Sequence, residues 1–135
     1  MTDRKQALTE LLAKVEAGVK YETMGHTRLC QRAFPKPDDF DGSRKAYSKS
    51  AAQQAILVWR NGSLDAAKAL FEAVAMDHWR ITHMWGDFDK WVVNLTHREG
   101  DWENKRRYIS VEAQCPARAL LIAILSALIA QGDAQ

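Results

Sequence analysis

The spacing of apolar residues changes near residue 76, and that change limits the folds this chain can adopt. Over 64–74 the apolar side chains recur every three to four positions, which is the spacing of an amphipathic helix. Over 79–85, 91–96 and 108–113 they alternate with other side chains, as in half-buried strands. Three such segments, separated by polar connections, predict an antiparallel β-meander that follows a helix.

A strongly apolar segment follows the strands. Between 117 and 130 only Arg118 and Ser126 are polar, and Pro116 precedes them at a position where a helix needs no backbone N–H. A helix that is apolar nearly all round is buried on more than one side, so we expect this segment to form the centre of the domain. Its apolar run is shorter than the about 20 residues that cross a membrane, and no membrane partner is expected.

Two more helices are predicted in the N-terminal part of the chain. The first begins with a capping residue, Asp3, and ends at Gly18, while the second follows Ser50. Between them, residues 20–48 lose the helical period and contain prolines and glycines, which predicts a long irregular loop. The N-terminal part, residues 1–62, is therefore interpreted as a helical extension.

The whole chain of 135 residues has an ordinary globular composition, 47% hydrophobic and 27% charged. We predict a single α+β domain with the element order α-α-α-β-β-β-α and a core over 63–131. The helices at 64–75 and 116–131 should pack on one face of the three-stranded antiparallel sheet. Covering its other face with the N-terminal helices would make a helix–sheet–helix sandwich.

Strict alternation along the strands predicts which side chains share a face. The helix-covered face should carry four residues of the first strand: Trp79, Ile81, His83 and Trp85. The opposite face should carry Arg80, Met84, Val92 and Tyr108. Because this second face is half apolar, we expect either the N-terminal helices or a second subunit to cover it.

Three motifs resemble a known group of proteins: Ser63-Leu64-Asp65-Ala66-Ala67, the position of Trp79, and Pro116-Ala117-Arg118-Ala119-Leu120. Over about residues 59–131 the chain is similar to small tailed-phage and prophage proteins of the phage ABA-sandwich family. The resemblance implies a helix–sheet–helix sandwich and a location in the cytoplasm of a bacterial host. Proteins of this kind are accessory factors: inhibitors of host defence, sponges for signalling nucleotides, or minor assembly factors. The family lends no catalytic or binding residues.

Catalytic and metal-binding motifs are not found in the sequence. His83, His97 and Cys115 would share the helix-covered face, but they lack the short-range ligand pair typical of zinc sites. Cys115 precedes a helix, where a thiol pKa can fall, yet it equally suits a plain capping role. Glycine-rich phosphate-binding loops are also missing. We therefore expect a protein that is not an enzyme and that uses no metal or cofactor.

The charge distribution counts against nucleic-acid binding. Residues 1–62 carry 11 basic and 7 acidic side chains, whereas 63–135 carry 8 and 10. The α-β-β-β-α order of the second part matches the double-stranded-RNA-binding domain, which needs a basic cluster at the start of its last helix. Only Arg118 stands there, and a net negative segment weakens binding to phosphates.

The strongest candidate site in the sequence is a polar loop that contains a tryptophan with no periodic reason to be buried. An exposed tryptophan among basic residues can stack on a base beside a phosphate, or can anchor a protein partner. The predicted ligand or partner site consists of Trp102, Arg98, Lys105, Arg106, Arg107 and Tyr108.

These observations favour a phage or prophage accessory protein that acts by binding. The main hypothesis is antagonism of a host defence system, either by gripping a protein component or by sequestering a small nucleotide signal. The alternative is a structural role, as a minor virion or assembly factor that oligomerises through its sheet face. A third hypothesis is a nucleic-acid module similar to the double-stranded-RNA-binding domain.

Overall fold

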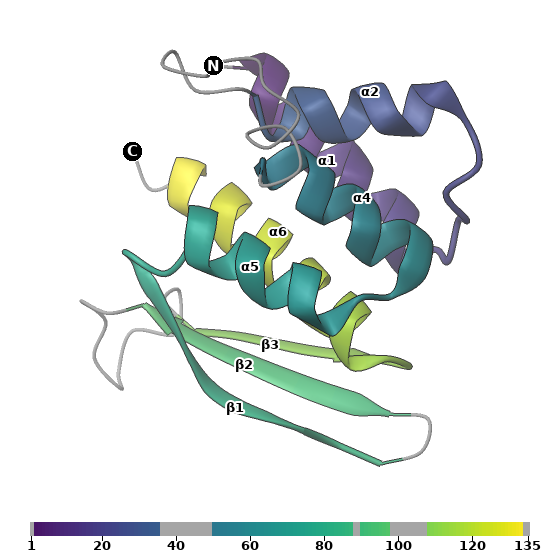
Figure 1. The fold of residues 1–135 in the computed structure, drawn as a ribbon. Helices are drawn as coiled ribbons and strands as arrows, with labels where there is room; N and C mark the ends of the chain where they lie inside the picture. Colours follow the sequence, from purple (N-terminus) through teal and green to yellow (C-terminus); the bar gives the residue numbers. More distant parts are fainter. Residues whose placement is uncertain (1, 36–49, 88–89, 98–107, 134–135) are drawn as a thin grey trace.

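The computed structural model describes residues 2–35, 50–87, 90–97 and 108–133 (Figure 1). Its helices and strands follow in this order: α1 (Thr2–Glu16), α2 (Met24–Ala33), α4 (Ala51–Asn61), α5 (Leu64–Val74), β1 (Trp79–Gly86), β2 (Trp91–His97), β3 (Tyr108–Ala113) and α6 (Pro116–Asp133). The strands form one antiparallel sheet in the order β1-β2-β3. This arrangement confirms the predicted α+β class and the three-stranded meander.

Helix α2 lies inside the stretch that was predicted to be an irregular loop, 20–48, so this part of the prediction is wrong. Thr23 caps the helix by accepting a hydrogen bond from the His26 N–H at 3.3 Å. The apolar face of α2 is short and consists of Leu29, Cys30 and Ala33. With Gly25 in its first turn, the segment contains too little helical period to be recognised from the sequence.

The helix boundaries predicted at Gly18, Ser50, Gly62 and Ser63 are confirmed, whereas Asp3, predicted as a cap, lies inside α1. Ser50 and Ser63 each accept a hydrogen bond from the backbone N–H three residues later, at 3.2 and 3.1 Å. Gly18 and Gly62 follow the ends of α1 and α4 with φ angles of +77° and +64°. These left-handed conformations favour glycine, which has no Cβ to clash.

The layers of the fold differ from the predicted sandwich. Helix α6 packs on the sheet mainly against β3 and β2 and touches β1 only slightly, and α5 packs beside α6. Helices α1 and α4 pack on α6 and α5 from the side away from the sheet, and α2 packs on α1 and α4. Figure 1 shows all the labelled helices on one side of the sheet. The described chain therefore has the layer order sheet, α5 with α6, and then α1, α2 and α4.

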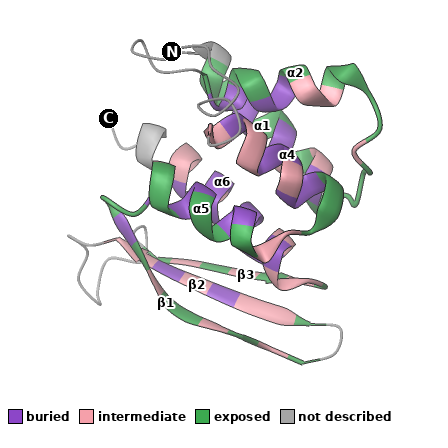
Figure 2. Ribbon diagram, viewed as in Figure 1, coloured by how far each residue is buried: buried purple, intermediate pink, exposed green. Residues whose placement is uncertain are grey.

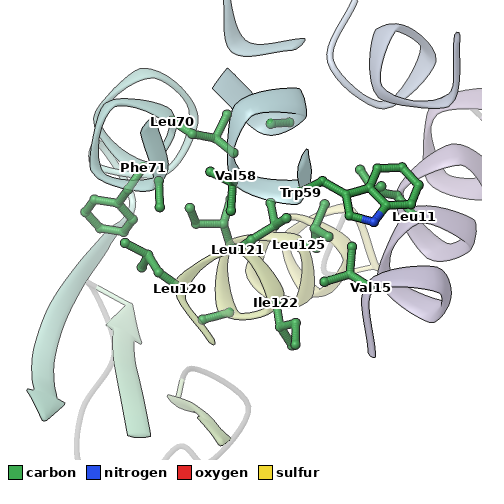
Figure 3. Close-up of a cluster of buried hydrophobic side chains, with 14 of the residues drawn as sticks. Leu11, Val15, Val58, Trp59, Leu70, Phe71, Leu120, Leu121, Ile122 and Leu125 are labelled. Carbon is green, nitrogen blue, oxygen red and sulfur yellow. The ribbon is translucent and has the colours of Figure 1, made fainter. Parts of the chain in front are cut away.

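The physical reason for this order lies in α6, which is apolar nearly all round. Covering it with the sheet alone would leave its far side in water, so the N-terminal helices bury that side instead. Figure 3 shows Leu120 pointing from α6 toward Phe71 of α5 and Leu121 toward Val58 of α4, whereas Ile122 points to the opposite side of α6. Within the described residues, no polar or charged side chain is fully buried.

One inserted residue in β1 changes the faces of the sheet. Ile81 pairs with Leu95 and His83 pairs with Asn94, so Thr82 is an extra residue, a β-bulge. Beyond the bulge every side chain of β1 changes face relative to strict alternation.

The bulge corrects three of the predicted positions. His83 and Trp85 lie on the face away from the helices, hereafter the outer face, whereas Met84 turns toward the core. Burial shows the change: Trp79, before the bulge, is 2% exposed, and Trp85, beyond it, is 56% exposed. Figure 2 shows the same contrast along β1. Of the residues predicted for the uncovered face, Arg80, Val92 and Tyr108 do lie there.

Candidate functional site

Most of the predicted site lies outside the described residues. This holds for Arg98, Trp102, Lys105, Arg106 and Arg107. The sixth member, Tyr108, is the first residue of β3, where it is half exposed on the outer face of the sheet and pairs with Thr96.

The histidines are divided between the two faces of the sheet. His97 packs edge-to-face on Trp79, with ring centroids 5.1 Å apart, and its ring stacks at 6.1 Å on that of His78. His83 instead packs edge-to-face on Trp85 on the outer face, with ring centroids 5.9 Å apart. The expectation that His83 and His97 share a face is therefore wrong, because the bulge separates them. The described part of the chain contains no cluster of three or more residues suited to a metal ion.

The two cysteines have structural positions. Cys115 stands before α6, and its Sγ accepts the backbone N–H of Arg118 at 3.3 Å, which is a capping contact. Cys30 is fully buried in α2, and burial raises the pKa of its thiol to about 12. A thiol with so high a pKa stays protonated at neutral pH and is a poor nucleophile.

The structure contains a groove of about 670 Å³ that lies along β3. We call it the β3 groove. One wall is the strand itself, residues 109–113, and the opposite wall is the end of α1, residues 15–18. Its floor is provided by α6 through Arg118, Ile122 and Ser126.

Two local features keep the groove open. β3 pairs with β2 on one side only, so among the described strands its other edge is free. On the opposite wall, Gly18 ends α1 in a left-handed turn, in which the Val19 N–H donates to the Lys14 carbonyl at 3.0 Å. The chain then leaves toward α2, so the last turn of α1 stands beside β3 without covering it.

The floor residues lie on one side of α6 because they are four positions apart. Residues i and i+4 of a helix are neighbours on one face. Ile122 is buried, whereas Arg118 and Ser126 are half-buried. The groove therefore presents a cation, an apolar side chain and a hydroxyl in a row. β3 contributes Ile109, Val111 and Ala113, which are half-buried and alternate with exposed residues.

The charges around the groove are unevenly paired. Glu112 forms an exposed ion pair with Lys90, with 3.5 Å between the Lys90 Nζ and the Glu112 Oε2. Arg118 forms no ion pair with any residue that the structure describes. Glu16, in the α1 wall, is exposed. The half-buried charge available in the β3 groove is thus the guanidinium of Arg118.

Reasoning from the sequence missed this groove. One signal was present: the only polar residues between 117 and 130, Arg118 and Ser126, lie eight positions apart, which puts them on the same side of a helix. Nothing in the sequence placed the end of the first helix beside the last strand, so the opposite wall, formed by residues 15–18, could not be foreseen.

Comparison with known proteins found no matching family model, no matching curated protein and no matching solved structure. The resemblance to phage proteins therefore stays a prediction. Among the described helices, none has both the length and the apolar character needed to span a membrane.

Proposed function

We propose that this protein acts by binding a partner protein, and that it holds an extended segment of that partner in the β3 groove. The observation that carries the proposal is the position of the groove along a free strand edge. A strand edge exposes backbone N–H and C=O groups at every second residue. An extended segment that pairs with them becomes a fourth strand, a common mode of peptide recognition.

The side-chain pattern of the groove supports the same mode. In an added strand, alternate side chains point to the same face of the sheet. Those that point inward would meet the floor formed by α6, while the others would stay in solvent on the outer face. The backbone contacts then supply affinity, and the floor residues supply selectivity.

This proposal favours one branch of the main hypothesis, the gripping of a protein component. A nucleotide's phosphates bind where several donors or cations converge, whereas the described lining of the groove contains one basic side chain, Arg118. We further propose that the partner belongs to a host defence system and is met in the bacterial cytoplasm. This part rests on the resemblance to phage accessory proteins.

The two alternative hypotheses have less support. On the predicted oligomerising face the exposed Trp85 takes the place of Met84, which packs toward the core, so the face stays half apolar. That face offers side chains alone, whereas the β3 edge adds a row of free backbone groups. RNA binding of the double-stranded type would need a cluster of basic side chains at the start of α6, where Arg118 is the basic residue present. In addition, α4 packs on α5 and so covers part of that helix.

The test is selection of short displayed peptides on the full chain, followed by an N-methyl scan of a selected peptide. N-methylation removes a backbone donor and blocks pairing at that position. We expect affinity to fall about tenfold or more at every second position, because an unsatisfied partner at a strand edge costs about 1–3 kcal/mol. Methylation at the intervening positions should have little effect.

Hydrogen exchange locates the bound peptide. We expect slower exchange for backbone amides of 109–113 and unchanged exchange for β1, the other edge of the sheet. Protection of β1 or of the outer face, or N-methyl effects without a period of two, would contradict strand addition at β3.

A further inference from the structure

The β3 groove also indicates what kind of segment it selects, an inference that rests on the proposed function. We infer that the groove selects a segment with an acidic side chain, Asp or Glu, opposite Arg118. The same segment places an apolar side chain opposite Ile122 and a small or polar one opposite Ser126. Each of these positions is two residues from the next along the partner.

The spacing of the floor matches the spacing of a strand. Successive floor residues, at positions 118, 122 and 126, are four apart in α6, which corresponds to about 6 Å along a helix. Alternate residues of a strand are about 6.6 Å apart. α6 starts just after β3 ends and runs back over the sheet (Figure 1), so that both line the groove. Three consecutive inward side chains of an added strand would therefore meet Arg118, Ile122 and Ser126 in turn.

The length of the strand edge agrees with this count. The wall formed by 109–113 spans about 13 Å at the rise of a strand. This length accommodates an added strand of about five residues, of which three point inward. The arrangement holds for either direction of the partner segment, because the spacing is the same in both.

The charge of the groove favours an acidic side chain at one end of this row. Arg118 is half-buried and forms no ion pair within the described structure. Of the two acidic residues that line the groove, Glu112 is engaged by Lys90, and Glu16 is exposed on the α1 wall. A carboxylate that enters the groove would meet the Arg118 guanidinium, whose planar fork suits carboxylate oxygens.

An internal acidic side chain fits better than a free C-terminus. Arg118 belongs to the same helix face as Ile122 and Ser126, so it meets a side chain of the inward row rather than the end of the backbone. A segment of this kind can lie anywhere in an exposed, extended part of the partner.

The experiment selects short random peptides, blocked at both ends, on three forms of the full chain: wild type, Arg118→Glu and Arg80→Glu. Arg80 is an exposed arginine on the outer face and does not line the groove, so the last variant controls for the change in overall charge. We expect wild type and Arg80→Glu to select an acidic residue two positions from an apolar one. Arg118→Glu should select a basic residue there and keep the apolar position.

The affinity for one selected acidic peptide measures how much Arg118 contributes to binding. The Arg118→Gln variant should bind it about 10- to 100-fold more weakly, as expected for a lost charge-assisted hydrogen bond. Replacing the acidic residue of the peptide by its amide should lower the affinity of the wild type by about the same factor. The same replacement should change the affinity of Arg118→Gln little.

The outcomes separate the two proposals. Peptides that protect 109–113 from exchange but carry no preferred acidic residue would overturn the inference and leave strand addition standing. Binding that requires a free peptide C-terminus would also overturn it. If the selection yields no peptide that protects β3, both the inference and the proposed function are wrong.

Discussion

The two edges of the sheet have different structures although they belong to the same three strands. β1 contains a bulge at Thr82 and ends at Gly86, and its register with β2 is interrupted. β3 pairs with β2 in unbroken register over all six of its residues. α6 packs closely along β3 and β2 but touches β1 only slightly, and the groove lies at β3.

This difference shows which structural features allow or prevent the addition of a strand at the edge of a sheet. A bulge twists a strand and spoils the regular row of backbone groups that another strand would need. A straight edge beside a side-chain floor offers both the row and a means of selection. The β1 edge therefore lacks the regular row of backbone groups that an added strand needs, and the β3 edge has it.

The largest expected effect concerns the two tryptophans on either side of the bulge. Trp79→Ala should destabilise the fold by about 3–5 kcal/mol, because it empties a buried site in the core. Trp85→Ala should change stability by no more than about 0.5 kcal/mol, because the side chain is exposed on the outer face. Urea unfolding measures both. Similar losses for the two variants would show that the bulge does not separate them.

A smaller effect is expected where β1 ends. A Cβ on Gly86 would lie 2.7 Å from the Lys90 carbonyl oxygen and would also overlap the Trp91 ring. Gly86→Ala should therefore cost about 1–3 kcal/mol, as for other overpacked positions. Gly25→Ala is the matched control: its nearest neighbour is 3.4 Å away, and alanine favours the helix by up to about 1 kcal/mol. A neutral Gly86→Ala variant would contradict the close packing of Trp91.

These examples show which parts of the fold can be predicted from the sequence. The caps at Ser50, Ser63 and Gly62 depend on residues a few positions apart, so the sequence pattern contains them. The bulge at Thr82 does not follow from alternation, since an inserted residue shifts every later one without changing the pattern's appearance. The layer order depends on whether the N-terminal helices bury the far side of α6 or the outer face of the sheet, which is decided only in the folded chain.

The candidate site was harder to predict for the same reason. Its walls come from residues 15–18, 109–113 and 118–126, which lie far apart in the sequence and carry no joint motif. Aromatic and basic residues attract attention in a sequence, and they led to the loop around Trp102. A free strand edge is made of backbone groups that every residue has, so no residue type announces it.

The bulge itself can be removed to make the two edges more alike. Deletion of Thr82 keeps the pairing of Ile81 with Leu95 and of His83 with Asn94. The fold should lose about 1 kcal/mol, because the Thr82 hydroxyl bonds to the Asn94 carbonyl and to Thr96, each at 3.3 Å.

The straightened β1 edge should then associate with other copies at high concentration, as sedimentation would show. Thr82→Ala is the control, since it removes the same hydroxyl and keeps the bulge. If the deletion variant stays as monodisperse as Thr82→Ala, the bulge is not what protects this edge.

The smallest effect tests the charge of the β3 groove from its other wall. Glu16 is an exposed carboxylate at the end of α1 and lines the groove, so it opposes an incoming acidic side chain. Glu16→Gln should strengthen binding of a selected acidic peptide about twofold, since exposed charge interactions amount to a few tenths of a kcal/mol.

Glu10→Gln, also exposed on α1 but not lining the groove, should leave the affinity unchanged. Peptide titration at low and at high salt shows whether a gain in affinity of Glu16→Gln comes from charge or from packing. A gain from charge shrinks as salt screens the exposed Glu16, whereas a gain from packing persists. A gain that persists at high salt would mean that the α1 wall acts on the partner through shape, and that Arg118 alone sets the charge preference of the groove.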